Sequence, residues 1–351
     1  MNVLIITIIY GIIFLLAFVS FLFLFILLRR IIINQLQRTF QKKYKQIEID
    51  ILEAISSPNP EACLKIARKY REQPNVLIKV LMDYADIIKG KEREKLKIIF
   101  NYTLKEKCLK ALNSAWTAKK LKALRLLIIF SDPSDIKKVI KFLHDKPILR
   151  LTVINALSRI QETETPSYIL QALEEDAHPN LLGYMHALYM MGNKIVKPLK
   201  RYLKNPLPVE KLGMLIELVG AIPLHPLYED IIAFSEHPDK EIRVKVARAL
   251  GNMQRLESIE ILKRLSNDNS WEVKAQAIKS LGKMKSIDAL KIISRGLFSP
   301  FWHVRYNAGY ALANLGAEGI KQLKRVAKQK KDRYAADMAS MVLDNIIYSK
   351  G

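Results

Sequence analysis

The stretch EIRVKVARALGNM (241–253) recurs 31 residues later as EVKAQAIKSLGKM (272–284), and again as HVRYNAGYALANL (303–315). A cation stands at the same place in each copy, at positions 243, 274 and 305. The step continues in both directions along one apolar position: Leu157, Leu188, Val219, Leu250, Leu281, Leu312 and Leu343. A fixed period of this length over half a chain indicates a repeat architecture.

Each repeat predicts two helices. The first has apolar residues three and four positions apart, as in Ile242, Val246, Leu250 and Met253, which gives a helix one apolar face. A second apolar segment follows a short break, as SIEILKRL at 258, SIDALKII at 286 and AEGIKQLKRVA at 317. Strand-like alternation is not sustained anywhere, so the predicted fold class is all-α.

The N-terminus is a second decisive feature. Only Thr7, Tyr10, Gly11 and Ser20 interrupt the apolar run from 3 to 28. As a helix this run spans roughly 39 Å, enough to cross a hydrocarbon core of ~30 Å. A cleaved export signal would have a basic start, a shorter apolar core and a small-residue cleavage site, and this run has none of these. The sequence therefore predicts an uncleaved transmembrane anchor.

Charge predicts the orientation of this anchor. Six cations follow the apolar run before the first acid: Arg29, Arg30, Arg38, Lys42, Lys43 and Lys45. By the positive-inside rule, we expect a single-pass protein with a short N-terminus outside and its body in the cytoplasm. The same cations should contact anionic lipid headgroups. Two isolated cysteines, Cys63 and Cys108, agree with a reduced compartment.

The segment after the anchor predicts a basic amphipathic helix. One apolar stripe follows spacings of four and three through Ile32, Leu36, Phe40, Tyr44, Ile47, Ile51 and Ile55. The stripe could pair with a second copy or dock on the following domain, and we favour docking. The predicted organisation is an anchor (1–28), this juxtamembrane helix (29–57), divergent helical repeats (58–147) and regular repeats of period 31 (148–351).

The repeat resembles the HEAT family, in particular the short HEAT-like units of phycobilisome lyases. The resemblance rests on D-x-x-[IV]-R followed by A-L-G, present here as Asp239, Ile242, Arg243, Ala249, Leu250 and Gly251. It implies a right-handed α-solenoid used for binding and rarely for catalysis. It also implies that Arg243 pairs with an acid at a repeat turn, Asp239 or Asp268, so its role would be structural.

The net charge of +23 favours anionic partners: acidic proteins, lipid headgroups or nucleic acid. Cations recur on the second helices, which the resemblance implies line a concave face, so stacked repeats would form a basic trough. The alternative is a solvated face, because the first helices are also rich in lysine. The candidate partner-binding cations are Lys200, Arg201, Lys204, Lys263, Arg264, Lys291, Arg295, Lys321, Lys324 and Arg325.

Trp271 and Trp302 are one period apart, near the start of their first helices. If exposed, they would form a hot spot for a protein partner. The alternative is that they fill the groove between repeats. We include both among the candidate partner-binding residues.

Catalytic signatures are missing from the sequence. It has no HExxH, nucleophile elbow or phosphate-binding glycine loop, and its six histidines have no ligand spacing. We therefore expect no enzyme activity, cofactor, metal site or small-molecule substrate. A chromophore-lyase role, suggested by the family's name alone, has no cysteine or histidine cluster to support it. The favoured hypothesis is a membrane-tethered scaffold for a protein partner, such as a membrane enzyme or assembly; the alternative is nucleic-acid binding through the basic surface.

Overall fold

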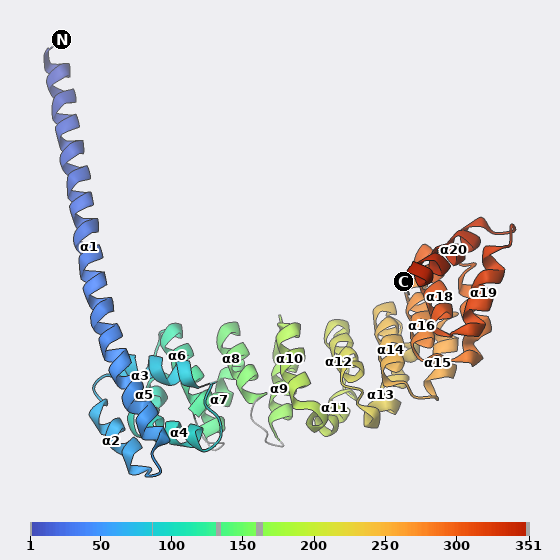
Figure 1. Ribbon diagram of the computed structural model, residues 1–351, viewed down its shortest axis with the longest axis horizontal. Helices are drawn as coiled ribbons and strands as arrows, with labels where there is room; N and C mark the ends of the chain where they lie inside the picture. The colour runs from blue at the N-terminus through green and yellow to red at the C-terminus, as the bar shows by residue number, and fades with distance from the viewer. Residues whose placement is uncertain (1, 86, 131–134, 159–163, 349–351) are drawn as a thin grey trace. The chain divides into compact units, whose positions relative to one another are not determined.

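The computed structural model describes residues 2–85, 87–130, 135–158 and 164–348, and in these ranges all regular elements are helices (Figure 1). The predicted all-α class is confirmed. The chain divides into two compact units, Met1–Ile136 and Lys137–Gly351. The four predicted segments stay a prediction, and their terminal residues 1 and 349–351 lie outside the described residues.

The first unit contains one very long helix and five shorter ones. Helix α1 contacts α2, α3 and α4. Its apolar residues from 13 to 28 are all exposed. The helices are α1 (Asn2–Ser56), α2 (Glu61–Lys69), α3 (Pro74–Tyr84), α4 (Lys91–Thr103), α5 (Lys105–Ala111) and α6 (Thr117–Phe130).

The apolar stripe of the juxtamembrane helix divides into two parts. Ile47, Ile51 and Ile55 are buried, so this part docks on its own unit as we expected. Ile32 and Leu36 are 55% and 64% exposed. Tyr44 lies between the two parts and donates a hydrogen bond to Asp83 at 2.9 Å. Burial and this carboxylate together raise the pKa of Tyr44 to about 12.

The second unit is a stack of helix pairs. Each first helix packs on the next first helix, and Figure 1 shows α8, α10, α12 and α14 side by side. The second helices α15, α17 and α19 each pack on the first helix before and after them. The first helices are α8 (Pro147–Leu157), α10 (Leu181–Met191), α12 (Val209–Ala221), α14 (Lys240–Met253), α16 (Trp271–Lys283), α18 (Trp302–Asn314) and α20 (Arg333–Tyr348).

The second helices are shorter, and several begin or end in a 3₁₀ turn. Two of them match the sequence segments at 258 and 317 to the residue. They are α9 (Thr165–Glu175), α11 (Val196–Tyr202), α13 (Tyr228–Ile232), α15 (Ser258–Leu265), α17 (Leu290–Gly296) and α19 (Ala317–Ala327). The unit also contains α7 (Ile136–Ile140), η2 (Lys141–His144), η3 (Gly192–Ile195), η4 (His225–Leu227), η5 (Ala233–Glu236) and η6 (Ile287–Ala289).

The 31-residue ladder forms the core of this unit. Six of its seven members are fully buried: Leu157, Leu188, Val219, Leu250, Leu281 and Leu312. The seventh, Leu343 in α20, is only half-buried, whereas the adjacent Val342 is buried. Within the described residues, no second helix follows α20.

The glycine of the A-L-G motif sets the spacing of the first helices. A Cβ atom at Gly251 would lie 2.5 Å from Cβ of Ser280, and one at Gly282 would lie 2.5 Å from Cα of Ala311. Neither contact is possible for a larger residue without moving a backbone. Small residues at these crossings therefore let α14, α16 and α18 approach closely.

The recurring arginine has the structural role that we expected. Arg243 donates two hydrogen bonds to Asp268, at 2.7 and 2.9 Å, and two more to the carbonyls of His237 and Pro238. Arg150 forms an ion pair with Asp176 in the same way. Burial is the largest single influence on Asp268 and opposes its ionised form, but the hydrogen bonds from Arg243 and from the backbone N–H of Ser270, together with the charge of Arg243, outweigh it and lower the pKa of this carboxyl.

Candidate partner-binding groove

Charge is distributed unevenly over the repeats. Residues 228–288 contain eleven Lys and Arg against ten Asp and Glu, whereas residues 289–331 contain nine Lys and Arg against Glu318 alone. The second stretch includes the second helices α17 and α19. Since a basic surface without acids attracts anions, these two helices form the candidate binding region.

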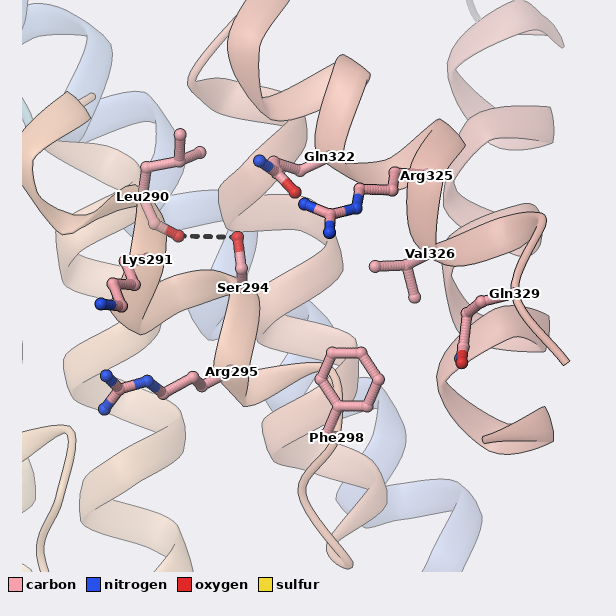
Figure 2. A pocket seen from close by; sticks show the side chains of 9 residues that line it. All are labelled: Leu290, Lys291, Ser294, Arg295, Phe298, Gln322, Arg325, Val326 and Gln329. Carbon is pink, nitrogen blue, oxygen red and sulfur yellow. Dashed lines mark hydrogen bonds between the residues drawn. The ribbon is translucent and has the colours of Figure 1, made fainter. Parts of the chain in front are cut away.

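A groove of about 490 Å³ lies between α17 and α19. In Figure 2, Gln322 and Arg325 extend from α19 toward α17, and the ring of Phe298 points into the space between the helices. We call this site the α17/α19 groove. It is lined by Leu290, Lys291, Ser294, Arg295, Phe298, Gln322, Arg325, Val326 and Gln329.

The groove combines a positive rim with apolar surface. Its three cations, Lys291, Arg295 and Arg325, are exposed and have no ion-pair partner among the described residues. Phe298 is 47% exposed, so its ring presents apolar surface to the groove. Ser294 is occupied, because its hydroxyl donates to the carbonyl of Leu290 at 2.7 Å. The site therefore suits a ligand with both an acid and an apolar group.

The other predicted cations divide into paired and unpaired groups. Lys263 is bonded to Glu260 at 2.7 Å, Arg264 lies 3.3 Å from Glu236, and Lys200 lies 3.5 Å from Asp230. These acids interrupt the predicted trough on α11, α13 and α15. The exposed cations without an ion pair in the described part of the chain include, beside the three of the groove, Arg201, Lys204, Lys321 and Lys324.

The two tryptophans lie on the first helices, away from the groove lining. Trp271 and Trp302 each begin a helix, α16 and α18, as their spacing predicted. His303 lies between them: its ring stacks on Trp271 at 4.8 Å and meets Trp302 edge-on at 5.2 Å. Trp302 also stacks on Tyr306 and remains 50% exposed. They thus belong to a partly exposed aromatic cluster, and their role as partner-binding residues stays a prediction.

Helix α1 is the one helix in the described ranges that is long and apolar enough to cross a membrane. None of its candidate spanning window is buried in the protein. The six cations of its flank, from Arg29 to Lys45, are exposed and have no ion pair among the described residues. Their side chains are therefore available to an anionic surface.

Two further features concern metal binding and the cysteines. The described residues contain no group of three His, Cys, Asp or Glu that could hold a metal ion. Burial raises the pKa of Cys63, and that of Cys108 to about 11, so both are neutral thiols near pH 7. Both thiols are buried in the first unit.

Sequence patterns missed part of the groove. They selected its cations but not Phe298 or Gln329, which lie in the turns that follow α17 and α19. A sequence signal for Phe298 does exist: it is an aromatic residue that directly follows a leucine at the end of an apolar helical segment. The pairing of Lys263 and Arg264 with acids was also not predicted.

Comparison with known proteins identifies the repeat. A profile of HEAT repeats matches residues 228–297 and 260–344. No curated protein sequence matches the chain. Kap121p is similar in structure at 14% identity, with a TM-score of 0.52 over 85% of this chain and 41% of that chain. Kap121p bound to Nup53p gives 13% identity and a TM-score of 0.54 with the same coverage.

A third structure, the CpcE and CpcF complex of phycocyanin lyase from Nostoc sp. PCC7120, is similar at 18% identity over 69% of this chain and 94% of that chain. Its TM-score is 0.31, so it carries no argument about this protein. The profile and the Kap121p structures agree on the class: the chain folds as a HEAT-repeat α-solenoid. Proteins of this class are typically scaffolds that bind other proteins.

Proposed function

We propose that the protein is a membrane-tethered HEAT-repeat scaffold that holds a protein partner at the cytoplasmic face. The observation that carries this proposal is the α17/α19 groove, where three unpaired cations surround the exposed ring of Phe298. A segment with an acidic residue beside an apolar one would satisfy both features. Such a ligand gains charge-assisted hydrogen bonds and removes apolar surface from water.

Helix α1 supports the membrane part of the proposal. Its apolar length matches a bilayer, and its exposed cations on the C-terminal side favour a cytoplasmic body and contact with anionic headgroups. Tethering would raise the local concentration of a membrane-bound partner, so even a weak contact at the groove would hold it. A membrane enzyme or assembly is the partner that gains most from this arrangement.

The chain is proposed to bind and not to catalyse. Its neutral buried thiols offer no nucleophile near pH 7. We also propose that it needs no cofactor. Activity of the partner, if it is an enzyme, would be changed only through location and contact.

A crosslinking pull-down from membranes tests the proposal. The full chain is compared with a version lacking residues 1–28, and with a triple charge reversal, Lys291→Glu with Arg295→Glu and Arg325→Glu. The matched control reverses Lys263 and Arg264, which already have acidic neighbours. We expect specific membrane proteins to be captured by the full chain and the control, and lost with the groove variant.

Two results would contradict the scaffold. Equal capture by the groove variant and the wild type would remove the groove from the function. Capture of nucleic acid by both long and short forms, falling steeply with salt, would favour the nucleic-acid alternative instead. Orientation is tested separately, by protease treatment of intact cells. Digestion of the repeats from the outside would refute a cytoplasmic body.

A further inference from the structure

A second basic pocket lies on the first helices, apart from the α17/α19 groove. It has a volume of about 510 Å³ and takes side chains from three successive repeats, on α14, α16 and α18. We call it the amide pocket. Its lining is Arg248, Asn252, Gln276, Lys279, Ser280, Gly282, Lys283, Lys285 and Asn314.

The tight crossing of the first helices creates this site. Gly251 lies against Ser280, and Gly282 lies against Ala311, so neighbouring helix axes come close enough for side chains of separate repeats to meet. One such contact is a hydrogen bond: Nζ of Lys283 on α16 donates to Oδ1 of Asn252 on α14 at 2.6 Å. A ligand in the pocket would therefore touch several repeats at once.

The pocket has an excess of hydrogen-bond donors. Lys279 and Lys285 have no side-chain partner among the described residues, and Lys283 uses one of its three N–H groups on Asn252. Arg248 alone has an acidic neighbour, Glu217 at 3.2 Å, which Lys245 shares at 2.7 Å. No acid belongs to the lining itself. An anion would find several cations with free donors.

Lys285 provides an independent observation. Its φ angle is +52°, in the left-handed region that favours glycine. The equivalent position one period later is Gly316, with φ +73°, and one period earlier it is Gln254, with φ +53°. Glycine would thus meet the backbone requirement without strain. The left-handed residue thus ends the first helix in each of these repeats, and in this repeat it is a lysine that adds a cation to the pocket.

The lining also distinguishes the kind of anion. The α17/α19 groove includes Leu290, Phe298 and Val326, whereas the amide pocket has no large apolar residue in its lining. A peptide with an apolar anchor would gain nothing there. Ammonium groups on flexible stems, together with amide N–H groups, are suited to a compact group with several charged oxygens. Phosphate is the common biological group of that description.

We infer that the amide pocket binds a small molecule that carries phosphate groups. Lys279, Lys283 and Lys285 contact the phosphate oxygens, and the side chains of Asn252 and Asn314 complete the site at its two ends. The one hydroxyl of the lining, Ser280, donates to the carbonyl of Ala247 at 2.7 Å, and the inference is of binding alone. This inference is independent of the proposed scaffold, since it concerns other residues on other helices.

The test uses the full chain in a neutral detergent at low ionic strength, with inorganic tripolyphosphate as the probe and calorimetry as the measurement. We expect saturable binding that weakens about tenfold in Lys279→Gln, the effect of losing one charge-assisted hydrogen bond. Lys285→Gly should also weaken binding while leaving the melting temperature equal or higher, because glycine relieves the left-handed strain. If Lys285 had only a structural role, replacing it would not weaken tripolyphosphate binding while leaving the melting temperature equal or higher.

The control is Arg333→Gln, at an exposed arginine outside both pockets that pairs with Asp337, and it should leave tripolyphosphate binding unchanged. A second arm places the chain in phosphatidylcholine nanodiscs with and without a phosphoinositide, and compares wild type with Lys279→Gln. Binding of soluble tripolyphosphate assigns a soluble ligand, and Lys279-dependent binding of the phosphoinositide alone assigns a lipid headgroup. The inference is overturned if neither probe binds, or if Arg333→Gln weakens binding as much as Lys279→Gln.

Discussion

Residues 228–288 and 289–331 belong to the same stack of repeats but use charge in different ways. In the first region, acids pair with most of the cations within the protein, as in Arg243 with Asp268 and Lys263 with Glu260. In the second, Lys291, Arg295 and Arg325 have no acidic partner among the described residues. The first region satisfies most of its charges internally, with the lysines of the amide pocket as the exception, whereas the second leaves its groove cations available to a partner.

The recurring arginine shows the difference at one position. Arg243 is held by a carboxylate and two carbonyls. Arg305, two periods later, keeps the two carbonyls, of Ser299 and Pro300, but has no acid. Its guanidinium lies over the ring of Tyr334 at 5.3 Å, and its buried Nε has no partner among the described residues. The position two periods after Asp268 is Lys330. Both arginines therefore donate to two backbone carbonyls at equivalent positions, but among the described residues only Arg243 also has an acidic partner.

The largest predicted effect tests whether the two regions share one core. Leu250→Ala and Leu312→Ala remove the same fully buried ladder residue from each region. Each should lower the free energy of unfolding by ~2–5 kcal/mol, because each leaves a cavity between tightly packed helices. Urea unfolding of the full chain in detergent, followed by circular dichroism, measures both. A cost for one and none for the other would show that the regions are not equivalent in packing; exposed Lys321→Ala is the control.

Asp268→Asn should have the next largest effect, because it removes the charge that holds Arg243. We expect a loss of about 1–3 kcal/mol in the free energy of unfolding, since a partly buried guanidinium loses two charge-assisted hydrogen bonds. The same unfolding experiment measures it. Glu318→Gln, an exposed acid in the basic region, should change stability little. Equal effects of the two substitutions would contradict the idea that acids are structural in residues 228–288.

Acid should weaken the first region through the same carboxyl. The pKa of Asp268 is lowered in the folded state, so its contribution to stability is complete above its unfolded pKa of about 3.9 and is lost as pH falls through the lower folded value. Hydrogen exchange below about pH 4 should therefore show a loss of protection in α14, relative to pH 5, that Asp268→Asn no longer shows. Arg305 has only carbonyl partners, so its bonds in α18 should not respond through this route.

The smallest predicted effect comes from giving Arg305 an acidic partner like the one that Arg243 has. Lys330→Asp places an acid at the position of Asp268 relative to Arg305, and it should raise the free energy of unfolding by ~0.2–1 kcal/mol. Thermal unfolding at low salt measures this gain, with Lys328→Asp as the control of equal charge change. If both variants are stabilised equally, the gain comes from lower net charge and not from a pair with Arg305.

Sequence determined more of the fold than of the site. The 31-residue period placed the helices, because apolar spacing within a repeat depends on local geometry that every copy shares. It also placed Trp271 and Trp302 at helix starts, and the resemblance to HEAT repeats implied that Arg243 pairs with an acid at a repeat turn. It did not predict that Leu343 is only half-buried, because the burial of this residue depends on what packs on α20.

What only the tertiary structure decided is which charges are free. A row of cations on the second helices looks uniform in sequence, but Glu236 and Glu260 lie close enough to Arg264 and Lys263 to neutralise two of them. No such acid reaches Arg325, which shares a groove with Phe298 from the preceding helix pair. Salt bridges and grooves join residues of different repeats, so their distances are set by how the helices stack. The period fixes which residues are buried, and the stacking fixes which of the remaining ones can bind.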